Sequence, residues 1–413
     1  MVYSIGLSTY YLSLVFSSLK IQSPKTDVSS PTLRCRVVLL HYFVKVIAAE
    51  ELEYVQALAK LNIARYAPME NILSISLKAS NVSPQGFHDF EKMAKVCHEY
   101  MVSFATEVGM PKRIELILAE NFDEVVSDIL GKSDTASGRF SSARPHGCVV
   151  GKNIVKDDSW DHVVIVFNAT FWDCTANSNS GNVLLQLGLI AHELAHPYID
   201  RMRFRSGAVK VATTDALELN VRNLSRLIID EYFADLIADA IVVIATRKPT
   251  DAGVTPVHMW DILGTNQIDT LRTYLTDNCA ALPNYANEYR ANKITFQVMW
   301  GEILSGIEQL FTIYIHARAF ADATKTEIPI FDSPEIQAVP FVQKYIPKSS
   351  MQFLDQLRKY RPPMSLGEWH NMEAVLLPAG EKSFLEIWEL LCVPKIPTPP
   401  SLLHLVWSYL MRV

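Results

Sequence analysis

An apolar run that ends in two histidines, residues 183–196, decides how this sequence folds. It reads Val-Leu-Leu-Gln-Leu-Gly-Leu-Ile-Ala-His-Glu-Leu-Ala-His, and so continuous an apolar stretch predicts a helix inside the protein. His192 and His196 are four residues apart, so their imidazoles lie on one face of that helix, one turn apart. Glu193 lies between them in the sequence. Burying these polar groups is costly unless they have a partner, and a bound cation would supply one.

The pattern His-Glu-x-x-His at residues 192–196 is typical of zinc hydrolases. Two imidazoles one turn apart can bind a single zinc ion, which lowers the pKa of a bound water toward ~7. The carboxylate of Glu193 projects to the side where that water would be, and it can remove the water's proton. A motif this short also arises by chance, so its interpretation depends on the rest of the sequence.

A catalytic zinc ion usually has three protein ligands and one open position, so we expect a third ligand downstream. The strongest candidate is Glu231, within a long helical pattern over residues 213–246. Asp235 comes four residues later and shares its helix face, which apolar residues flank. An acidic pair in an apolar stripe is expensive unless it binds a cation or hydrogen-bonding partners.

Other arrangements remain open for the acidic residues. Asp200, one turn after the second histidine, could be the third ligand instead. Asp230 is adjacent to Glu231 but points about a quarter-turn away on the helix. The acids of the pair could also face solvent or form salt bridges with Arg222 and Arg226.

Two further features bear on the site. Pro197 directly follows the second histidine and disfavours helical geometry there, which predicts that the helix ends or kinks at His196. A hydrogen-bond donor for a tetrahedral oxyanion is also expected near the metal. Nothing in the sequence ranks the candidates for that role, which are Tyr232, His258, Tyr314 and His316.

Taken together, the two motifs resemble those of the gluzincin metallopeptidases. The His-Glu-Leu-Ala-His motif is followed by Glu-x-x-Ala-Asp beginning at Glu231, which is similar to the branch of HtpX-like and prenyl-protein endopeptidases. The resemblance covers roughly residues 110–245. It implies that zinc is bound by His192, His196 and Glu231. It also implies that Glu193 is the general base and that Asp235 fixes the tautomer and orientation of His192.

The predicted elements favour an α+β fold. We expect a zincin-like catalytic core, with a small mixed sheet, an active-site helix and a third-ligand helix, within a mainly α-helical chain. The strand predicted at 162–168 precedes the active-site helix. That order lets an edge strand lie beside the metal site, where it would hold an extended substrate by strand addition. The other predicted elements are strands at 36–40, 113–118 and 147–151, and helices at 48–61, 87–108, 122–130 and, with breaks, 266–324.

The proline content changes along the chain and indicates a domain boundary. Eleven of the 21 prolines lie between Pro329 and Pro400, which indicates a separate C-terminal subdomain or a wrapping extension. We therefore expect four parts: a mixed or helical N-terminal region at 1–109, the catalytic core at 110–250, a helical region at 251–328 and the Pro-rich segment at 329–413.

The overall balance of residues is that of a globular protein with a sizeable core, because 49% are hydrophobic and 20% are charged. A net charge of −6 gives no electrostatic reason to expect a nucleic-acid partner. Six scattered cysteines without a C-x-x-C pair indicate buried thiols in a reducing compartment, so we expect a cytoplasmic protein. The alternative is export or membrane anchoring through the uncharged residues 1–19. Elsewhere no stretch approaches the ~20 apolar residues of a membrane span.

These observations predict a zinc-dependent peptidase that acts on a peptide or protein substrate. Zinc would polarise the scissile carbonyl while Glu193 deprotonates the water and passes the proton to the leaving amine. One alternative is a non-catalytic interaction protein with a vestigial or structural metal site. Glu193 argues against it, because a structural site needs no base and usually closes its fourth position. The other alternative is a zinc hydrolase that acts on a non-peptide amide.

Overall fold

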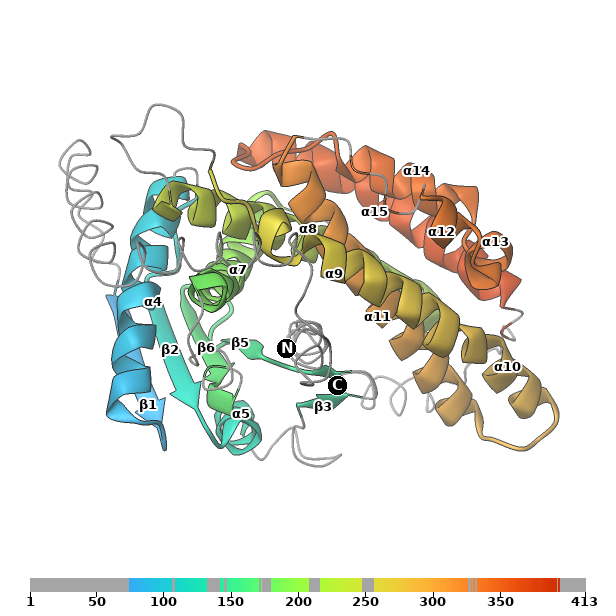
Figure 1. Ribbon diagram of the computed structural model, residues 1–413, viewed down its shortest axis with the longest axis horizontal. Helices are drawn as coiled ribbons and strands as arrows, with labels where there is room; N and C mark the ends of the chain where they lie inside the picture. The colour runs from blue at the N-terminus through green and yellow to red at the C-terminus, as the bar shows by residue number, and fades with distance from the viewer. Residues whose placement is uncertain are drawn as a thin grey trace, which may run out of the picture.

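The structure is a computed structural model, and most of its described residues are helical, with one small mixed sheet (Figure 1). This confirms the α+β class. Within the described part of the chain, no helix has the length and apolar character that crossing a bilayer requires. The strand predicted at 36–40, the helix predicted at 48–61 and the segment 1–19 lie outside the described residues. The described residues are 74–105, 108–131, 142–144, 147–170, 172, 180–207, 216–246, 256–325, 328, 330, 333–391 and 393.

Four strands form the main sheet in the order β1–β2–β6–β5. The first three are parallel, whereas β5 runs antiparallel to β6 at one edge. The strands predicted at 113–118 and 162–168 are confirmed as β2 and β6. The bounds are Ser74–Ser80 for β1, Arg113–Ala119 for β2, Gly151–Val155 for β5 and His162–Asn168 for β6.

The edge strand beside the active-site helix is β5, so the expectation that the strand at 162–168 takes this position is wrong. β6 pairs with β2 on one side and with β5 on the other. Six of its seven side chains are buried, as a continuous Val- and Ile-rich run is when both sheet faces are covered. The run predicted at 147–151 contains β4 (Gly147–Cys148), which pairs with β3 (Ala143–Arg144), and β5 begins where that prediction ends.

Alternate residues of β6 enter two different cores, as the two-residue period of a strand requires. Val163, Ile165 and Phe167 join the main core, to which α4 (Pro84–Phe104) contributes one face. Val164 and Val166 join a smaller core beneath α5 (Phe122–Leu130). The helices predicted at 87–108 and 122–130 are therefore present, and together they cover both faces of the sheet.

Two long helices, α7 (Ser180–Arg205) and α8 (Ala216–Thr246), pack against each other and carry the predicted metal ligands. α11 (Phe296–Ala323) and α15 (Leu366–Leu390) also pack against α8. Every residue of α8 from 227 to 239 is consequently buried. The other α-helices are α9 (Met259–Thr273), α10 (Leu282–Arg290), α12 (Pro334–Gln337), α13 (Pro340–Tyr345) and α14 (Lys348–Leu357). Between α9 and α10 lie a π-helix, Tyr274–Asn278, and a 3-10 helix, Cys279–Ala281.

Pro197 does not end α7, so the expectation that the helix ends at His196 is wrong, whereas the alternative of a kink there stays a prediction. The helix continues to Arg205 with Pro197 inside it. Tyr198, Ile199 and Met202, which follow the proline, are at most 2% exposed. Their packing outweighs the loss of a single backbone N–H donor.

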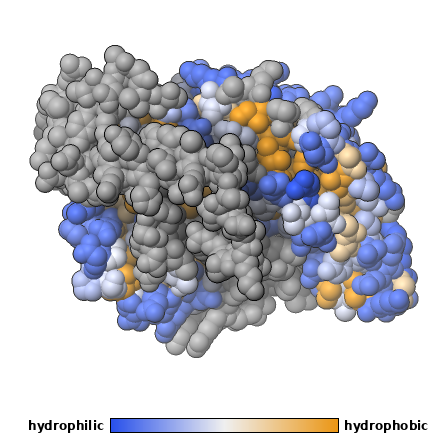
Figure 2. Space-filling view, in the orientation of Figure 1, coloured by the Kyte–Doolittle hydropathy of each residue, from blue (hydrophilic) through white to orange (hydrophobic). Residues whose placement is uncertain are grey.

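The Pro-rich region beyond residue 329 is mainly helical. Pro334 and Pro340 stand in the first turn of their helices, where the missing N–H has no cost. Trp369 and Met372 of α15 belong to the same core as Phe90 of α4. Figure 2 shows hydrophobic residues gathered on the helical part of the molecule, with hydrophilic residues along its outer rim. The four-part division of the chain stays a prediction.

Candidate metal centre

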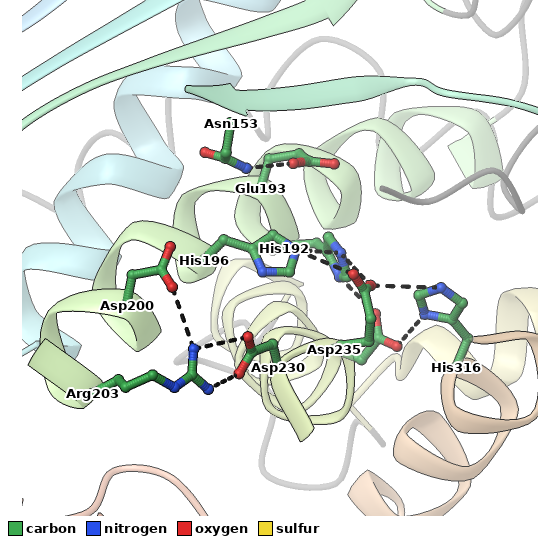
Figure 3. Close-up of polar contacts among 10 residues, drawn as sticks. Asn153, His192, Glu193, His196, Asp200, Arg203, Asp230, Asp235 and His316 are labelled. Carbon is green, nitrogen blue, oxygen red and sulfur yellow. Dashed lines mark hydrogen bonds and ion pairs between the residues drawn. The ribbon is translucent and has the colours of Figure 1, made fainter. Parts of the chain in front are cut away.

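Helices α7 and α8 bring the predicted zinc ligands together in the protein interior (Figure 3). The Nε2 atoms of His192 and His196 are 3.1 Å apart. Glu231 faces them from α8, with Oε2 3.2 Å from His192 Nε2 and Oε1 3.8 Å from His196 Nε2. One ligating atom of each residue lies within 4.8 Å of the other two, and all three side chains are buried.

This donor set fits a bound metal ion. His192 Nδ1 donates a hydrogen bond to Asp235 Oδ1 over 2.8 Å, which turns the Nε2 lone pair of His192 toward the other ligands. Neither carboxylate oxygen of Glu231 has a hydrogen-bond partner among the described residues. Buried carboxylate oxygens beside imidazole nitrogens are unfavourable unless a proton or a metal cation lies between them. Ligands of a tetrahedral zinc ion lie about 3.4 Å apart, close to the separations in this group.

The carboxylates of Glu231 and Asp235 favour positive charge at the candidate metal site. Burial would lower the pKa of His192, but Asp235 and Glu231 raise it well above its usual value. Burial would raise the pKa of Glu231, but the histidines, His192 foremost, lower it. Burial lowers the pKa of His196 to about 4, so this imidazole is neutral at neutral pH. Asp235 and Glu231 thus favour a proton on His192. A metal ion that binds His192 would replace this proton, because an imidazole must be deprotonated to act as a ligand.

Asp235 bridges two histidines from different helices. Its Oδ1 accepts the hydrogen bond from His192, and its Oδ2 lies 2.5 Å from Nδ1 of His316 on α11. Burial would raise the pKa of Asp235, but His316 and His192 lower it to about 2, so the carboxylate is ionised. Asp235 therefore stands against His192, as the resemblance implies. The sequence does not single out His316 for this contact, because no motif spacing connects residues 81 positions apart.

Glu193 is held by the edge strand β5. Asn153 Nδ2 donates a hydrogen bond to Glu193 Oε2 over 2.7 Å (Figure 3). A Cβ atom on Gly151 would lie 2.6 Å from Cδ and Oε1 of Glu193, so the carboxylate occupies space that only glycine leaves. Residues 151 and 153 share one face of the strand. Neither residue could be recognised from the sequence. The strand predicted there ends at residue 151, whereas β5 begins at that residue and places 151 and 153 on one face.

Asp200 and Asp230 face Arg203 rather than the metal group. Arg203 Nη1 lies 3.4 Å from Asp200 Oδ1 and 3.0 Å from Asp230 Oδ2. Its Nε donates to Glu373 Oε1 of α15 over 2.6 Å. Burial, followed by the charge of Asp230, raises the pKa of Asp200 to about 8, so Asp200 is mostly protonated at neutral pH. A protonated acid bound to arginine is a poor zinc ligand, which leaves Glu231 as the third donor of the group.

The remaining sequence candidates are engaged elsewhere. Tyr232 donates its O–H to an aspartate of α11 over 2.9 Å, and His258 Nδ1 lies 2.8 Å from an aspartate of α8. Tyr314 is buried within α11. Arg222 pairs with a glutamate of α15 instead of the acids next to the histidines. Those acids, Glu231 and Asp235, are fully buried and do not face solvent.

We compared the chain with known proteins. No protein-family model, no curated protein and no solved structure matches this chain. Among the described residues, His192, His196 and Glu231 make up the one group of three or more such side chains that could hold a metal ion. Two imidazole nitrogens and one carboxylate are donors that suit zinc.

Proposed function

We propose that this chain is a zinc-dependent peptidase, with the metal ion bound by His192, His196 and Glu231. The observation that carries the proposal is that the three ligands lie beside a fourth functional group, Glu193, which the edge strand holds in place. Two imidazoles and a carboxylate form the ligand set of catalytic zinc sites that keep one position open. Among the described residues, no fourth histidine, cysteine or acid joins the group.

Glu193 is the base in this proposal. A bound zinc ion would polarise a substrate carbonyl and lower the pKa of a water molecule toward ~7. Glu193 accepts the proton of that water on its carboxylate and passes it to the leaving nitrogen. The hydrogen bond from Asn153 Nδ2 fixes the direction of the Glu193 carboxylate. The proposed base is therefore oriented before a substrate arrives.

The edge strand supports a peptide as the substrate. Among the described strands, β5 pairs with β6 alone, and the face that carries Gly151 and Asn153 lies against Glu193. A strand at the edge of a sheet can bind an extended peptide through its backbone N–H and C=O groups. A small non-peptide amide has no use for such an edge.

The base is tested with the variant Glu193→Gln. We expect the variant to bind as much zinc as the wild-type chain, because Glu193 is not a ligand. Cleavage of a peptide library is expected to fall by about 100-fold or more, the usual contribution of a general base. Metal analysis and mass spectrometry of the library measure the two effects. Undiminished cleavage by the variant would remove Glu193 from this role.

The ligand set is tested with Glu231→Ala, which we expect to lose zinc. Asp200→Asn is the matched control: Asp200 is mostly protonated at neutral pH, so the amide changes little and zinc is retained. Full zinc retention by Glu231→Ala would overturn the assignment of the third ligand. If the wild-type chain binds one zinc ion but cleaves no peptide, the peptidase proposal fails. A screen of small amides would then distinguish a zinc hydrolase of non-peptide amides from a non-catalytic metal-binding protein.

A further inference from the structure

We propose that His316 is a positioning residue of the metal centre, which acts through Asp235 to hold His192 in its metal-binding orientation. This inference rests on the proposed metal site and adds to it a residue from a third helix, α11. His316 is 1% exposed, and its Nδ1 lies 2.5 Å from Asp235 Oδ2. The other oxygen of the same carboxylate binds His192.

The two contacts on Asp235 act together. A carboxylate held at one oxygen can still rotate about the bond that joins it to Cβ. With Oδ1 bound to His192 and Oδ2 bound to His316, the plane of the carboxylate is fixed from both sides. A fixed carboxylate fixes the imidazole that donates to it, and with it the direction of the Nε2 lone pair.

His316 also faces the third ligand. Its Nε2 lies 3.8 Å from Glu231 Oε2, and its ring centroid lies 5.7 Å from that of His192. The imidazole is therefore next to both Glu231 and Asp235, which are four residues apart on one face of α8. This contact gives α11 a direct link to Glu231, the proposed ligand on α8, in addition to the packing between the two helices.

The position of His316 argues against two other roles. Its nitrogens do not belong to the described group whose ligating atoms all lie within 4.8 Å of one another, so it is not a fourth ligand. In Figure 3, His316 lies beyond Asp235, on the side away from Glu193 and Asn153. It is thus remote from the base and the edge strand, where a substrate would be bound.

Two substitutions separate the Asp235 contact from the rest of the imidazole. Asparagine places its amide nitrogen where Nδ1 of histidine lies, so His316→Asn keeps a donor for Asp235. Glutamine places its amide nitrogen where Nε2 lies, so His316→Gln loses that donor. His98→Gln, at a buried histidine of α4, is the control for the loss of a buried imidazole as such.

The experiment measures Zn²⁺ affinity of the full chain by competition with a chelator, and the absorption spectrum of bound Co²⁺. We expect His316→Gln to bind Zn²⁺ about 10- to 100-fold more weakly and to show an altered Co²⁺ spectrum. His316→Asn and His98→Gln are expected to stay within a few-fold of the wild-type chain. Urea unfolding of each metal-free chain checks that the variants are folded, and His316→Leu replaces the glutamine variant if that one is not.

Two results would overturn the proposal. One is wild-type Zn²⁺ affinity in His316→Gln or His316→Leu. The other is an equal loss in the asparagine and glutamine variants, since the bond to Asp235 would then not be the cause. In both cases the wild-type chain still binds Zn²⁺, so the proposed function survives. If the wild-type chain itself binds no Zn²⁺, the proposed function fails and the role of His316 fails with it.

Discussion

The carboxylate of Glu193 fills a space that Gly151 leaves open on the edge strand. A methyl group at residue 151 would lie within 2.6 Å of that carboxylate. The group that has to give way is the end of a flexible side chain, so the change costs little stability but moves the proposed base. The same strand supplies the hydrogen bond from Asn153. The geometry of the proposed base is therefore set by two residues outside the His-Glu-x-x-His motif.

We predict that Gly151→Ala lowers peptide cleavage at least about tenfold, because the base loses its position next to the reacting water. Zinc content is expected to be unchanged, and the free energy of unfolding is expected to change by less than about 1 kcal/mol. Metal analysis, urea unfolding and a cleavage assay on the same preparation measure the three quantities. Normal cleavage with a displaced Glu193 would show that its orientation does not matter.

His98 makes the stability of the protein sensitive to acid. This buried histidine of α4 has no described partner for Nε2. Burial lowers its pKa from 6.5 to about 4, so below pH 6.5 the unfolded chain binds a proton that the folded chain refuses. The resulting loss of unfolding free energy, present in full only below the folded-state pKa of about 4, reaches up to about 3 kcal/mol.

We predict that His98→Gln removes this part of the acid sensitivity. Urea unfolding at about pH 7 and about pH 5 is measured for both chains, and the variant is expected to lose less stability between the two conditions. Comparing the chains cancels the titration of all other groups. The same loss in both would mean that His98 does not contribute.

Sequence patterns could identify the site residues on α7 and α8, and they could not identify those on β5 and α11. His192, His196, Glu231 and Asp235 stand out because a spacing of four within an apolar helix marks polar groups on a buried face. Asn153 and His316 reach their partners across 40 and 81 residues. Contacts of that range leave no periodic signal in a single sequence.

Among the elements, α7 carries the largest departure from local preference. Pro197 lies within a helix that continues to Arg205, and it lacks the N–H that would bond to the carbonyl of Glu193. The turn after the proline is tied down by buried apolar residues and by the ion pair of Arg201 with Asp161. Tertiary contacts thus maintain a helix that its own sequence disfavours.

We predict that Pro197→Ala raises the free energy of unfolding by up to about 3 kcal/mol, because it restores a backbone donor and removes a steric conflict in the helix. Urea unfolding of the metal-free protein measures the change, and Pro378→Ala, at the proline inside α15, is the parallel case. Lower stability in the Pro197 variant would show that the packing of α7 requires the local geometry that proline imposes.

The two neighbouring strands β5 and β6 differ in how clearly their own sequences predict them. Residues 163–167 are continuously apolar, and the burial of this run as an inner strand follows from that pattern. β5 reads Gly-Lys-Asn-Ile-Val, a short mixed segment that gives no clear strand signal. Its place at the edge of the sheet results from pairing with β6, which is a property of the folded chain and not of the segment itself.

At the scale of the whole molecule, the Pro-rich C-terminal region helps to build the part that holds the metal centre. α15 packs against α8, and Glu373 of α15 binds Arg203 of α7. The two helices approach closely at Gly380, where a Cβ atom would lie 2.6 Å from Ser225 Oγ. A Cβ atom on Gly367, near the start of the same helix, would meet nothing within 4 Å.

We predict opposite effects of alanine at these two glycines. Gly380→Ala is expected to lower the free energy of unfolding by about 1–3 kcal/mol, because the added methyl group forces α15 and α8 apart. Gly367→Ala is expected to raise it by up to about 1 kcal/mol, because alanine favours the helix more than glycine does. Thermal and urea unfolding measure both. Equal effects would contradict the close packing of α15 on α8.

The hydrogen bonds that complete the centre join residues 40, 43 and 81 positions apart, on β5, α7, α8 and α11. Closing such long loops costs entropy before any of these contacts forms, so the centre assembles late in folding. During synthesis, His192 leaves the ribosome long before His316 does. The complete set of contacts around the proposed metal site therefore exists only after α11 has been synthesised.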